Sequence, residues 1–263
     1  MNDDNWLELN NINIIKNNRK ILKNINLKLR NKETVVLLGP NGSGKSTLIE
    51  TIARVNYPRV EEKSSIKILG NENINIFEMR SKIGFVYTDL HARIKRNEKV
   101  INIIISGING YIGMGLNILE DRSINNKAEE IMNSLDLSSL SDRLYFELSD
   151  GQKRKVLIGR ALINNPNYLI IDEITNALDI KSKYEIIELL NKLSLKKISI
   201  LYVTHSLDSI LKFTDRVILI KNGIIHGDGS PCDILTNDNL SNLYDIDLKV
   251  TYINGYWNSI PVK

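Results

Sequence analysis

The sequence of 263 residues predicts an α/β domain that is interrupted by a helical insertion. A glycine-rich segment, residues 39–47, lies between an apolar β-rich run, Thr34–Leu38, and a stretch with apolar residues at helical spacing, Lys45–Arg54. The pattern is helical over about 89–148, and strand and helix patterns alternate again beyond Tyr168. Such alternation is typical of a sheet covered by helices.

The first strands are indicated by alternation of apolar and polar residues. Trp6–Ile15 alternates, a polar turn follows at Asn17-Asn18, and the apolar residues within 25–29 alternate again. Two further β-rich runs are Ile66–Leu69 and Ile83–Tyr87. We expect a strand at each of these segments.

The insertion and the C-terminal half supply the remaining elements. Apolar residues from Val100 to Gly107 share one helical face, and a second helix is expected over Ser123–Leu135, with Ser123 as its N-cap. An Asn222-Gly223 pair between two apolar runs is a hairpin signal. The later elements expected are helices at Lys153–Ile163, Lys181–Leu193 and Ser206–Lys212, and strands at Tyr168–Ile171, Ile198–Val203, Arg216–Ile220 and Ile224–His226.

Composition excludes several classes of protein. The net charge of +4 is too mild and too scattered for a nucleic-acid footprint, so no nucleic-acid partner is expected. The single cysteine, Cys232, cannot form an internal disulfide and suits a reducing cytosol. The polar N-terminal stretch is not a secretory signal, and no apolar run approaches the roughly 18 residues of a membrane span.

The segment 39–47 reads GPNGSGKST and matches the phosphate-binding pattern G-x-x-x-x-G-K-[ST]. Its glycines let backbone N–H groups turn inward as an anion nest, Lys45 can reach the β- and γ-phosphates, and the Ser46 hydroxyl can ligate Mg²⁺. The candidate nucleotide-binding residues are Gly39, Pro40, Asn41, Gly42, Ser43, Gly44, Lys45, Ser46 and Thr47.

A second motif, LSDGQ, occupies residues 148–152. Ser149 and Gln152 have the spacing of a capping box, which places Gly151 in the first turn of a helix. The N-terminus of a helix with a free hydroxyl can receive an anion, although the motif alone is equally consistent with a well-capped helix.

Acidic and basic side chains follow two of the expected strands. Asp172 ends an apolar strand and is suited to hold Mg²⁺, and Glu173 can accept a proton from an attacking water. His205 ends another strand, at the sheet edge where open α/β sheets bind ligands. Glu173, His205 and Lys45 are therefore the candidate catalytic residues. His91 and His226 lack such a context and are interpreted as surface residues.

Five motifs occur in one order: the phosphate loop, LSDGQ, Asp172-Glu173 after four apolar residues, Asn176–Asp179, and VTH ending at His205. In this order and spacing the chain resembles the ATP-binding-cassette (ABC) ATPases over nearly its whole length. The resemblance implies a P-loop NTPase with a RecA-like core, an antiparallel β lobe and an inserted α-helical subdomain. The implied division is a core at 1–88 and 164–235, a helical subdomain at 89–163 and a C-terminal tail at 236–263.

The resemblance also implies ATP hydrolysis with Mg²⁺ in a head-to-tail dimer. Ser149, Gly151 and Gln152 of one subunit would then face the nucleotide held by the other, and Asp179 resembles the residue that couples the two sites. Residues 88–163 and the tail are similar to importer ATPases for iron chelates, vitamin B12 and molybdate. That similarity implies an integral membrane permease as partner and a cytoplasmic, peripheral location. A cytosolic ABC ATPase without transport, in iron–sulfur assembly, repair or ribosome function, and a nucleotide-binding regulator remain alternatives.

Four positions depart from the family pattern. Lys16 stands where an aromatic residue usually stacks on adenine, which predicts weaker base contact and relaxed selectivity for ATP over GTP. Thr88 replaces the glutamine that usually contacts the metal, which it could reach only through water. Asp150 replaces a glycine, and Ile174 replaces a proline. The basic segment 91–96 is either a solvated loop or part of a docking site for the permease.

Overall fold

The computed structural model describes residues 4–58, 63–87, 90, 93–108 and 121–262. The chain forms two compact units: unit 1 combines Met1–Asn75 with Leu190–Lys263, and unit 2 is Ile76–Leu189. The boundaries expected from the family resemblance stay a prediction. No described helix is long and apolar enough to cross a bilayer.

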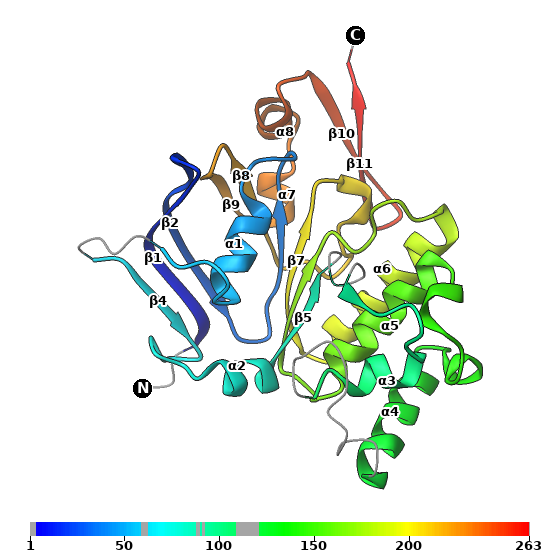
Figure 1. Cartoon of the computed structure of the whole chain (residues 1–263). Helices are drawn as coiled ribbons and strands as arrows, with labels where there is room; N and C mark the ends of the chain where they lie inside the picture. The colour runs from blue at the N-terminus through cyan, green and yellow to red at the C-terminus, as the bar shows by residue number, and fades with distance from the viewer. Residues whose placement is uncertain (1–3, 59–62, 88–89, 91–92, 109–120, 263) are drawn as a thin grey trace. The chain divides into compact units, whose positions relative to one another are not determined.

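Unit 1 contains the expected antiparallel lobe. Strands β1 (Asn5–Lys16), β2 (Arg19–Arg30) and β4 (Ser65–Ile68) form one sheet in the order β2-β1-β4 (Figure 1). Asn17 and Asn18 both have positive φ, 47° and 59°, which is the backbone of the two-residue hairpin turn that joins β1 to β2. The alternating pattern of the sequence therefore predicted this hairpin correctly.

The larger sheet of unit 1 is built around two strands that are buried along their whole length. Parallel strands β7 (Ser199–Thr204), β3 (Thr34–Leu38) and β8 (Arg216–Lys221) lie side by side, and β9 (Ile224–Gly229) pairs antiparallel with β8. Every residue of β3 and β7 is buried, as expected for parallel strands covered on both faces. The Asn222-Gly223 turn joins β8 to β9 with φ of 51° and 76°, which confirms the hairpin signal.

The prediction of a helix at Ser206–Lys212 is wrong. Only a short 3₁₀ turn, η4 (Leu207–Ser209), is present, and Ile210 is extended, with φ −63° and ψ 132°. The Ser206 N–H donates to Thr204 Oγ1, and the Ser209 hydroxyl donates to the Ser206 carbonyl. Short polar side chains here satisfy the backbone locally and compete with a longer helix.

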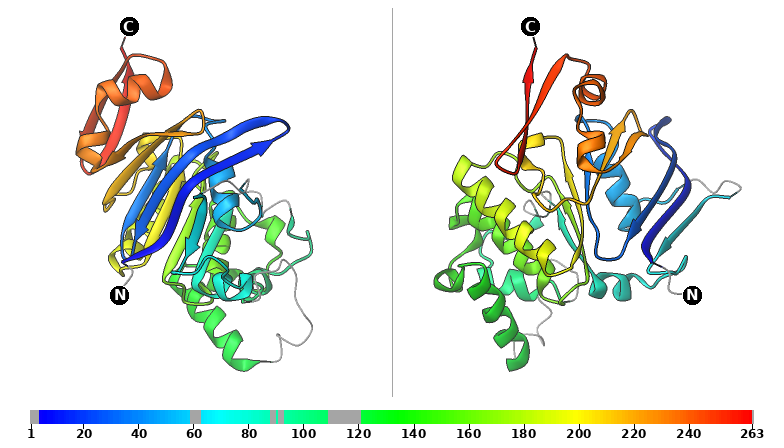
Figure 2. Two further views of the ribbon diagram at one scale, coloured as in Figure 1. Left: turned by 90° about the vertical axis from the view of Figure 1, so that its left-hand side faces the viewer. Right: turned by 180° about the vertical axis from the view of Figure 1, so that it is seen from behind.

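The C-terminal segment of unit 1, which includes the tail predicted at 236–263, forms regular helices and strands. It contains α7 (Pro231–Ile234), α8 (Asn237–Tyr244) and a hairpin of β10 (Leu248–Ile253) with β11 (Tyr256–Pro261). Figure 2 shows this hairpin in red as two long strands that lie beside α8.

Unit 2 combines a strand pair with several helices. Strands β5 (Ile83–Tyr87) and β6 (Tyr168–Asp172) are parallel. The helices are α2 (Ile76–Lys82), α3 (Val100–Ile105), α4 (Arg122–Ser134), α5 (Asp150–Leu162), α6 (Ile180–Leu195, which continues into unit 1) and the 3₁₀ turns η2 (Ser138–Leu140) and η3 (Tyr145–Glu147).

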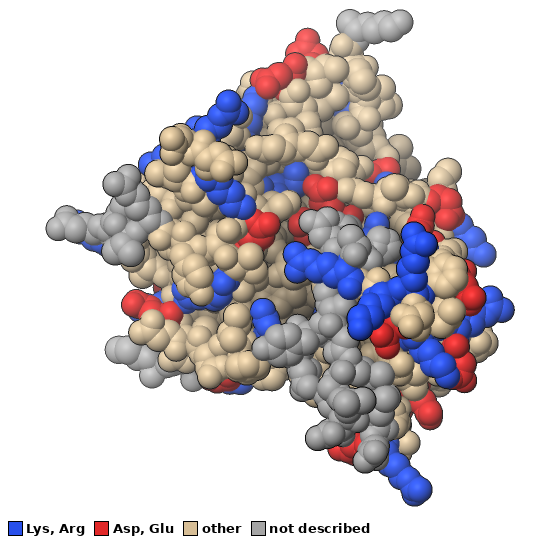
Figure 3. Space-filling view, in the orientation of Figure 1, with Lys and Arg blue, Asp and Glu red and all other residues tan. Residues whose placement is uncertain are grey.

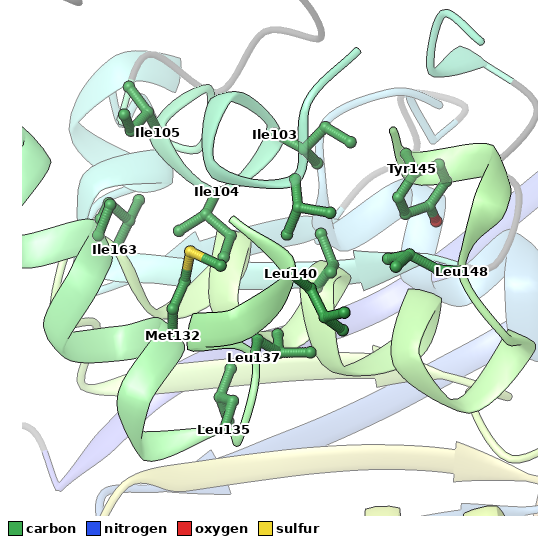
Figure 4. Close-up of a cluster of buried hydrophobic side chains, with 13 residues drawn as sticks. Ile103, Ile104, Ile105, Met132, Leu135, Leu137, Leu140, Tyr145, Leu148 and Ile163 are labelled. Carbon is green, nitrogen blue, oxygen red and sulfur yellow. The ribbon is translucent and has the colours of Figure 1, made fainter. Parts of the chain in front are cut away.

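Helices α3, α4 and α5 enclose a hydrophobic cluster (Figure 4). Ile104, Met132 and Val156, one from each helix, are at most 1% exposed. This packing confirms the apolar face expected on Val100–Gly107. The N-cap of α4 is Asp121 rather than Ser123, because the Asp121 carboxylate accepts the Ser123 N–H at 2.9 Å. Ser123 was therefore wrongly predicted as the cap.

Candidate functional site

The phosphate-loop segment 39–47 leads from β3 into α1 (Lys45–Ile52) in unit 1. Gly44 has a φ of 106°, and a Cβ there would lie 2.8 Å from Leu22 Cδ2, so no larger residue fits. The Lys45 side chain is held inward: the residue is 4% exposed, and Nζ donates to the carbonyls of Gly39 at 2.8 Å and Pro40 at 3.0 Å. The loop thus concentrates a buried cation and the N-terminus of a helix at one place, which suits an anion.

Two hydroxyl groups of the loop lie in different environments. Ser43 is 3% exposed, and its Oγ has no hydrogen-bond partner within the described part of the chain. A buried hydroxyl in that condition fits a loop that binds a polar ligand. Ser46 is exposed at the start of α1, where its hydroxyl is accessible to a metal ion that accompanies phosphate.

His205 follows β7 in the same unit and is partly buried. Its carbonyl accepts a hydrogen bond from the Tyr244 hydroxyl of α8 at 2.8 Å. Burial raises the pKa of Tyr244, which keeps this hydroxyl protonated as a donor. The C-terminal segment therefore fixes the backbone that carries His205.

The acidic pair of unit 2 lies at the end of β6. Asp172 is the last residue of the strand, and Glu173 adopts the left-handed region with φ 48°. Asn176 Nδ2 donates to Glu173 Oε2 at 2.6 Å, and the Asn176 N–H donates to the Glu173 carbonyl at 3.2 Å. These bonds hold both the backbone and the carboxylate of Glu173 in one orientation.

The LSDGQ motif forms the capping box that its spacing predicts. Ser149 Oγ accepts the Gln152 N–H at 3.3 Å, and Gln152 Oε1 accepts the Ser149 N–H at 3.0 Å. Gly151 packs against α6, where a Cβ would lie 2.6 Å from Ser182 Oγ. Asp179 accepts the Ser182 N–H at 3.0 Å, and hydrogen bonds from the Ser182 hydroxyl and backbone lower the pKa of Asp179. The starts of α5 and α6 are therefore in contact.

The basic segment is described only from Arg93 onward. Arg93 and Lys95 line a pocket of unit 2 together with Arg160, whose Nε donates to Ser106 Oγ at 3.2 Å. Burial first, and then the charge of Arg80, lowers the pKa of Arg160 to about 10. Figure 3 shows Lys and Arg side chains, with Asp and Glu among them, on the visible face of unit 2 where Figure 1 places α5 and α6.

The predicted residues thus fall into two groups. Unit 1 carries 39–47 and His205, and unit 2 carries Asp172, Glu173 and the residues of LSDGQ. Their assembly into one site stays a prediction. Thr88 and His91 lie outside the described residues, and His226 is exposed as expected. Sequence reasoning missed Tyr244, Asn176 and Ser182. Tyr244 contacts His205 from 39 positions away, which no local spacing predicts. Asn176 and Ser182 each lie three positions after their partners, Glu173 and Asp179, so this local spacing could have found them.

Comparison with known proteins identifies the family. The ABC transporter family model matches residues 22–176. The uncharacterized ABC transporter ATP-binding protein YlmA of Bacillus subtilis is 33% identical over 257 residues, which cover 96% of this chain and 94% of that protein. The sulfate/thiosulfate import ATP-binding protein CysA of Pectobacterium atrosepticum is 32% identical, covering 87% of this chain and 67% of that protein. The hemin import ATP-binding protein HmuV of Hahella chejuensis is 28% identical, covering 91% and 92%.

Solved structures agree with this result. The ADP conformation of the ATP-binding cassette MJ1267 superposes with a TM-score of 0.77 at 26% identity, covering 92% of this chain and 98% of that one. A dimeric structure of the ATP-binding cassette MJ0796 bound to ADP and Pi gives 0.70 at 27% identity, covering 85% and 98%. The confirmed features are the P-loop NTPase fold and its antiparallel lobe. This chain therefore belongs to the ABC transporter family and is one of its ATP-hydrolysing, ATP-binding subunits.

Proposed function

We propose that this subunit powers the import of a metal chelate or a related small solute. The observation that carries the proposal is the similarity to the hemin import protein HmuV, which extends over nearly the full length of both chains. The similarity to CysA covers a smaller share of that protein, so a sulfate-type cargo is less well supported. Cargo specificity would reside in other subunits, because a cytoplasmic ATPase does not contact the solute.

The proposed reaction is in-line attack of water on the γ-phosphorus. Glu173 accepts the proton of the attacking water, the bond between the γ-phosphorus and the bridging oxygen breaks, and ADP leaves with the electron pair. Lys45 stabilises the charge that develops on the phosphate oxygens, and His205 holds the water and the γ-phosphate in position. Asn176 supports this role of Glu173, because its amide fixes the carboxylate by the 2.6 Å hydrogen bond.

Ser46 and Asp172 are the residues that would hold Mg²⁺. Among the described residues there is no cluster of three or more His, Cys, Asp or Glu that could bind a metal alone. The hydroxyl of Ser46 and the carboxylate of Asp172 fit Mg²⁺, because proteins usually bind this ion through one or two side chains together with substrate phosphates. When bound, the ion would neutralise charge on the transferred phosphoryl group.

We further propose that two copies form a head-to-tail dimer and bind an integral membrane permease at the inner face of the membrane. Ser149, Gly151 and Gln152 of one copy would contact the nucleotide of the other, with Asp179 coupling the two sites. The dimeric structure of MJ0796 with ADP and Pi supports this arrangement. The exposed Ser149 hydroxyl at the N-terminus of α5 supports it as well, because it is accessible to a second copy.

The experiment that tests this proposal is affinity purification of the tagged chain from detergent-solubilised native membranes, with and without ATP. We expect a stoichiometric polytopic membrane protein to be recovered. Reversing the charges of Arg93 and Arg96 should weaken that complex and spare basal ATPase activity. Recovery with cytosolic partners alone would instead favour an ATPase of iron–sulfur assembly or another role without transport.

A further inference from the structure

The end of the β1–β2 hairpin carries an ion pair where the family usually has an aromatic ring. Lys16 Nζ lies 2.6 Å from Glu50 Oε2, and Asn56 Nδ2 donates to the same oxygen at 2.5 Å. Lys16 is the last residue of β1, Glu50 belongs to α1, and Asn56 follows α1. We call these three residues the Lys16 cluster.

The Lys16 cluster lies beside the phosphate loop, within unit 1. Glu50 is four residues beyond Ser46 on α1, so the two share a helix face and lie about 6 Å apart along the axis. The hairpin contacts the loop directly, since a Cβ on Gly44 would be 2.8 Å from Leu22 Cδ2 and 3.4 Å from the Ile21 carbonyl. The β1–β2 hairpin therefore contacts both the phosphate loop, through Leu22, and α1, through Lys16.

The cluster offers hydrogen-bonding groups to a nucleotide base. The Lys16 and Glu50 side chains are each 40% exposed, so a ligand can reach them. Within the part of the chain that the structure describes, Glu50 Oε1 accepts no hydrogen bond, and Lys16 directs one of its three N–H donors at Glu50. An exposed ion pair contributes little to folding, so stability alone is a weak reason for this arrangement.

Both purines have edges that fit a donor beside an acceptor. Lys16 can donate to O6 of guanine or N1 of adenine, while Glu50 accepts from N1–H of guanine or from the N6 amine of adenine. Stacking on an aromatic ring also accepts either purine, but it contacts the face of the base and not its edge.

We propose that Lys16, Glu50 and Asn56 bind the purine base by its edge, and that the protein accepts GTP as well as ATP. This inference rests on the phosphate loop proposed above. The sequence alone predicted weak contact between the protein and the base, because Lys16 cannot stack. With Glu50 beside Lys16, we expect hydrogen bonds to hold the base instead.

Binding of ATP, GTP and tripolyphosphate, each with Mg²⁺, to the full chain by calorimetry tests the proposal. We expect ATP and GTP to bind within about 10-fold of each other and tighter than tripolyphosphate, which has no base. Glu50→Ala should weaken ATP and GTP about 3- to 10-fold and leave tripolyphosphate unchanged. Lys16→Ala should do the same. The matched control is Glu78→Ala, which breaks an exposed pair with Lys82 (2.8 Å) and should change none of these affinities.

Three results would overturn the proposal. The first is a Glu50→Ala variant with unchanged affinity for both nucleotides. The second is loss of base binding on replacing Tyr57, a 71% exposed ring next to Asn56, because a stacking ring would then hold the base. The third is an affinity for ATP more than about 100-fold above that for GTP. Tripolyphosphate separates this failure from failure of the phosphate loop. If it does not bind to the unmodified protein, the phosphate-loop assignment itself is wrong, whereas if it binds as tightly as ATP and GTP, only the inference about the base is wrong.

Discussion

Replacing Gly151 by alanine tests the contact between the start of α5 and the start of α6. A Cβ at this position would lie 2.6 Å from Ser182 Oγ and 2.8 Å from Ser182 Cβ. The hydroxyl can rotate away, but Cβ cannot. Because carbon atoms pack at about 3.5–4.0 Å, the two helix starts would have to separate by about 1 Å.

The expected loss of stability follows from this overlap. Overpacking of a tight contact costs about 1–3 kcal/mol, and alanine in a helix returns about 0.5–1 kcal/mol relative to glycine. We expect Gly151→Ala to lower the free energy of unfolding by up to about 2.5 kcal/mol, measured by urea denaturation. Ser182→Gly should relieve the overlap, because the nearest remaining atom, the Cα of residue 182, is 3.8 Å away.

A double-mutant cycle of Gly151→Ala and Ser182→Gly shows whether position 151 needs a glycine for packing or for ATP hydrolysis. If packing requires the glycine, Gly151→Ala costs stability when Ser182 is present and much less in the Ser182→Gly background. An equal loss in both backgrounds would refute the packing argument. ATP turnover is the second readout: stability restored without turnover would mean that the nucleotide of the partner copy also needs a glycine at position 151.

Other predictions concern single contacts of the two units. Glu173→Gln should slow ATP turnover about 10²- to 10⁴-fold while nucleotide still binds, and near-normal turnover would contradict its role as base. Asn176→Ala should lower kcat by about 10-fold with little change in KM, because the amide orients the Glu173 carboxylate. Tyr244→Phe removes the hydrogen bond to the His205 carbonyl and should lower kcat about 5-fold, whereas no change would show that the bond is dispensable. Asp179 has a pKa below its ordinary 3.8, so its contribution to stability is present at neutral pH and is lost as the pH falls below that value. The urea midpoint should therefore fall less steeply with acid in Asp179→Asn than in the unmodified protein.

The sequence predicted local structure correctly where a few neighbouring residues determine the backbone conformation. The capping box at Ser149 and Gln152 and the two-residue turns at Asn17-Asn18 and Asn222-Gly223 are examples, because each depends on side chains within four positions. The cap of α4 was missed for the same local reason. Asp121 and Ser123 are both good caps, and the spacing alone does not choose between them.

Contacts between distant segments were not predictable from the sequence. Tyr244 reaches His205 across 39 positions, and Lys16 reaches Glu50 across 34. Neither pair belongs to a shared pattern, since the distance between them is set by how α8 packs near β7 and how the hairpin packs on α1. Sequence motifs therefore indicated the residues for phosphate chemistry, while their supporting partners required the fold.

The departure at Lys16 falls where it least affects the chemical step. Interactions that bind substrate and transition state equally alter KM, and only those that strengthen in the transition state alter kcat. Contacts to the base belong to the first kind, because the base is remote from the γ-phosphate, and contacts through Glu173 belong to the second. An ion pair can therefore replace a ring at Lys16 without loss of phosphoryl chemistry. Lys16→Tyr removes the contact that Lys16 makes with the base and adds a ring that can stack on it. The KM for ATP should therefore fall by about 10-fold if the ring stacks fully, with kcat still set by Glu173. A large change of kcat in that variant would mean that the base position is coupled to the chemical step.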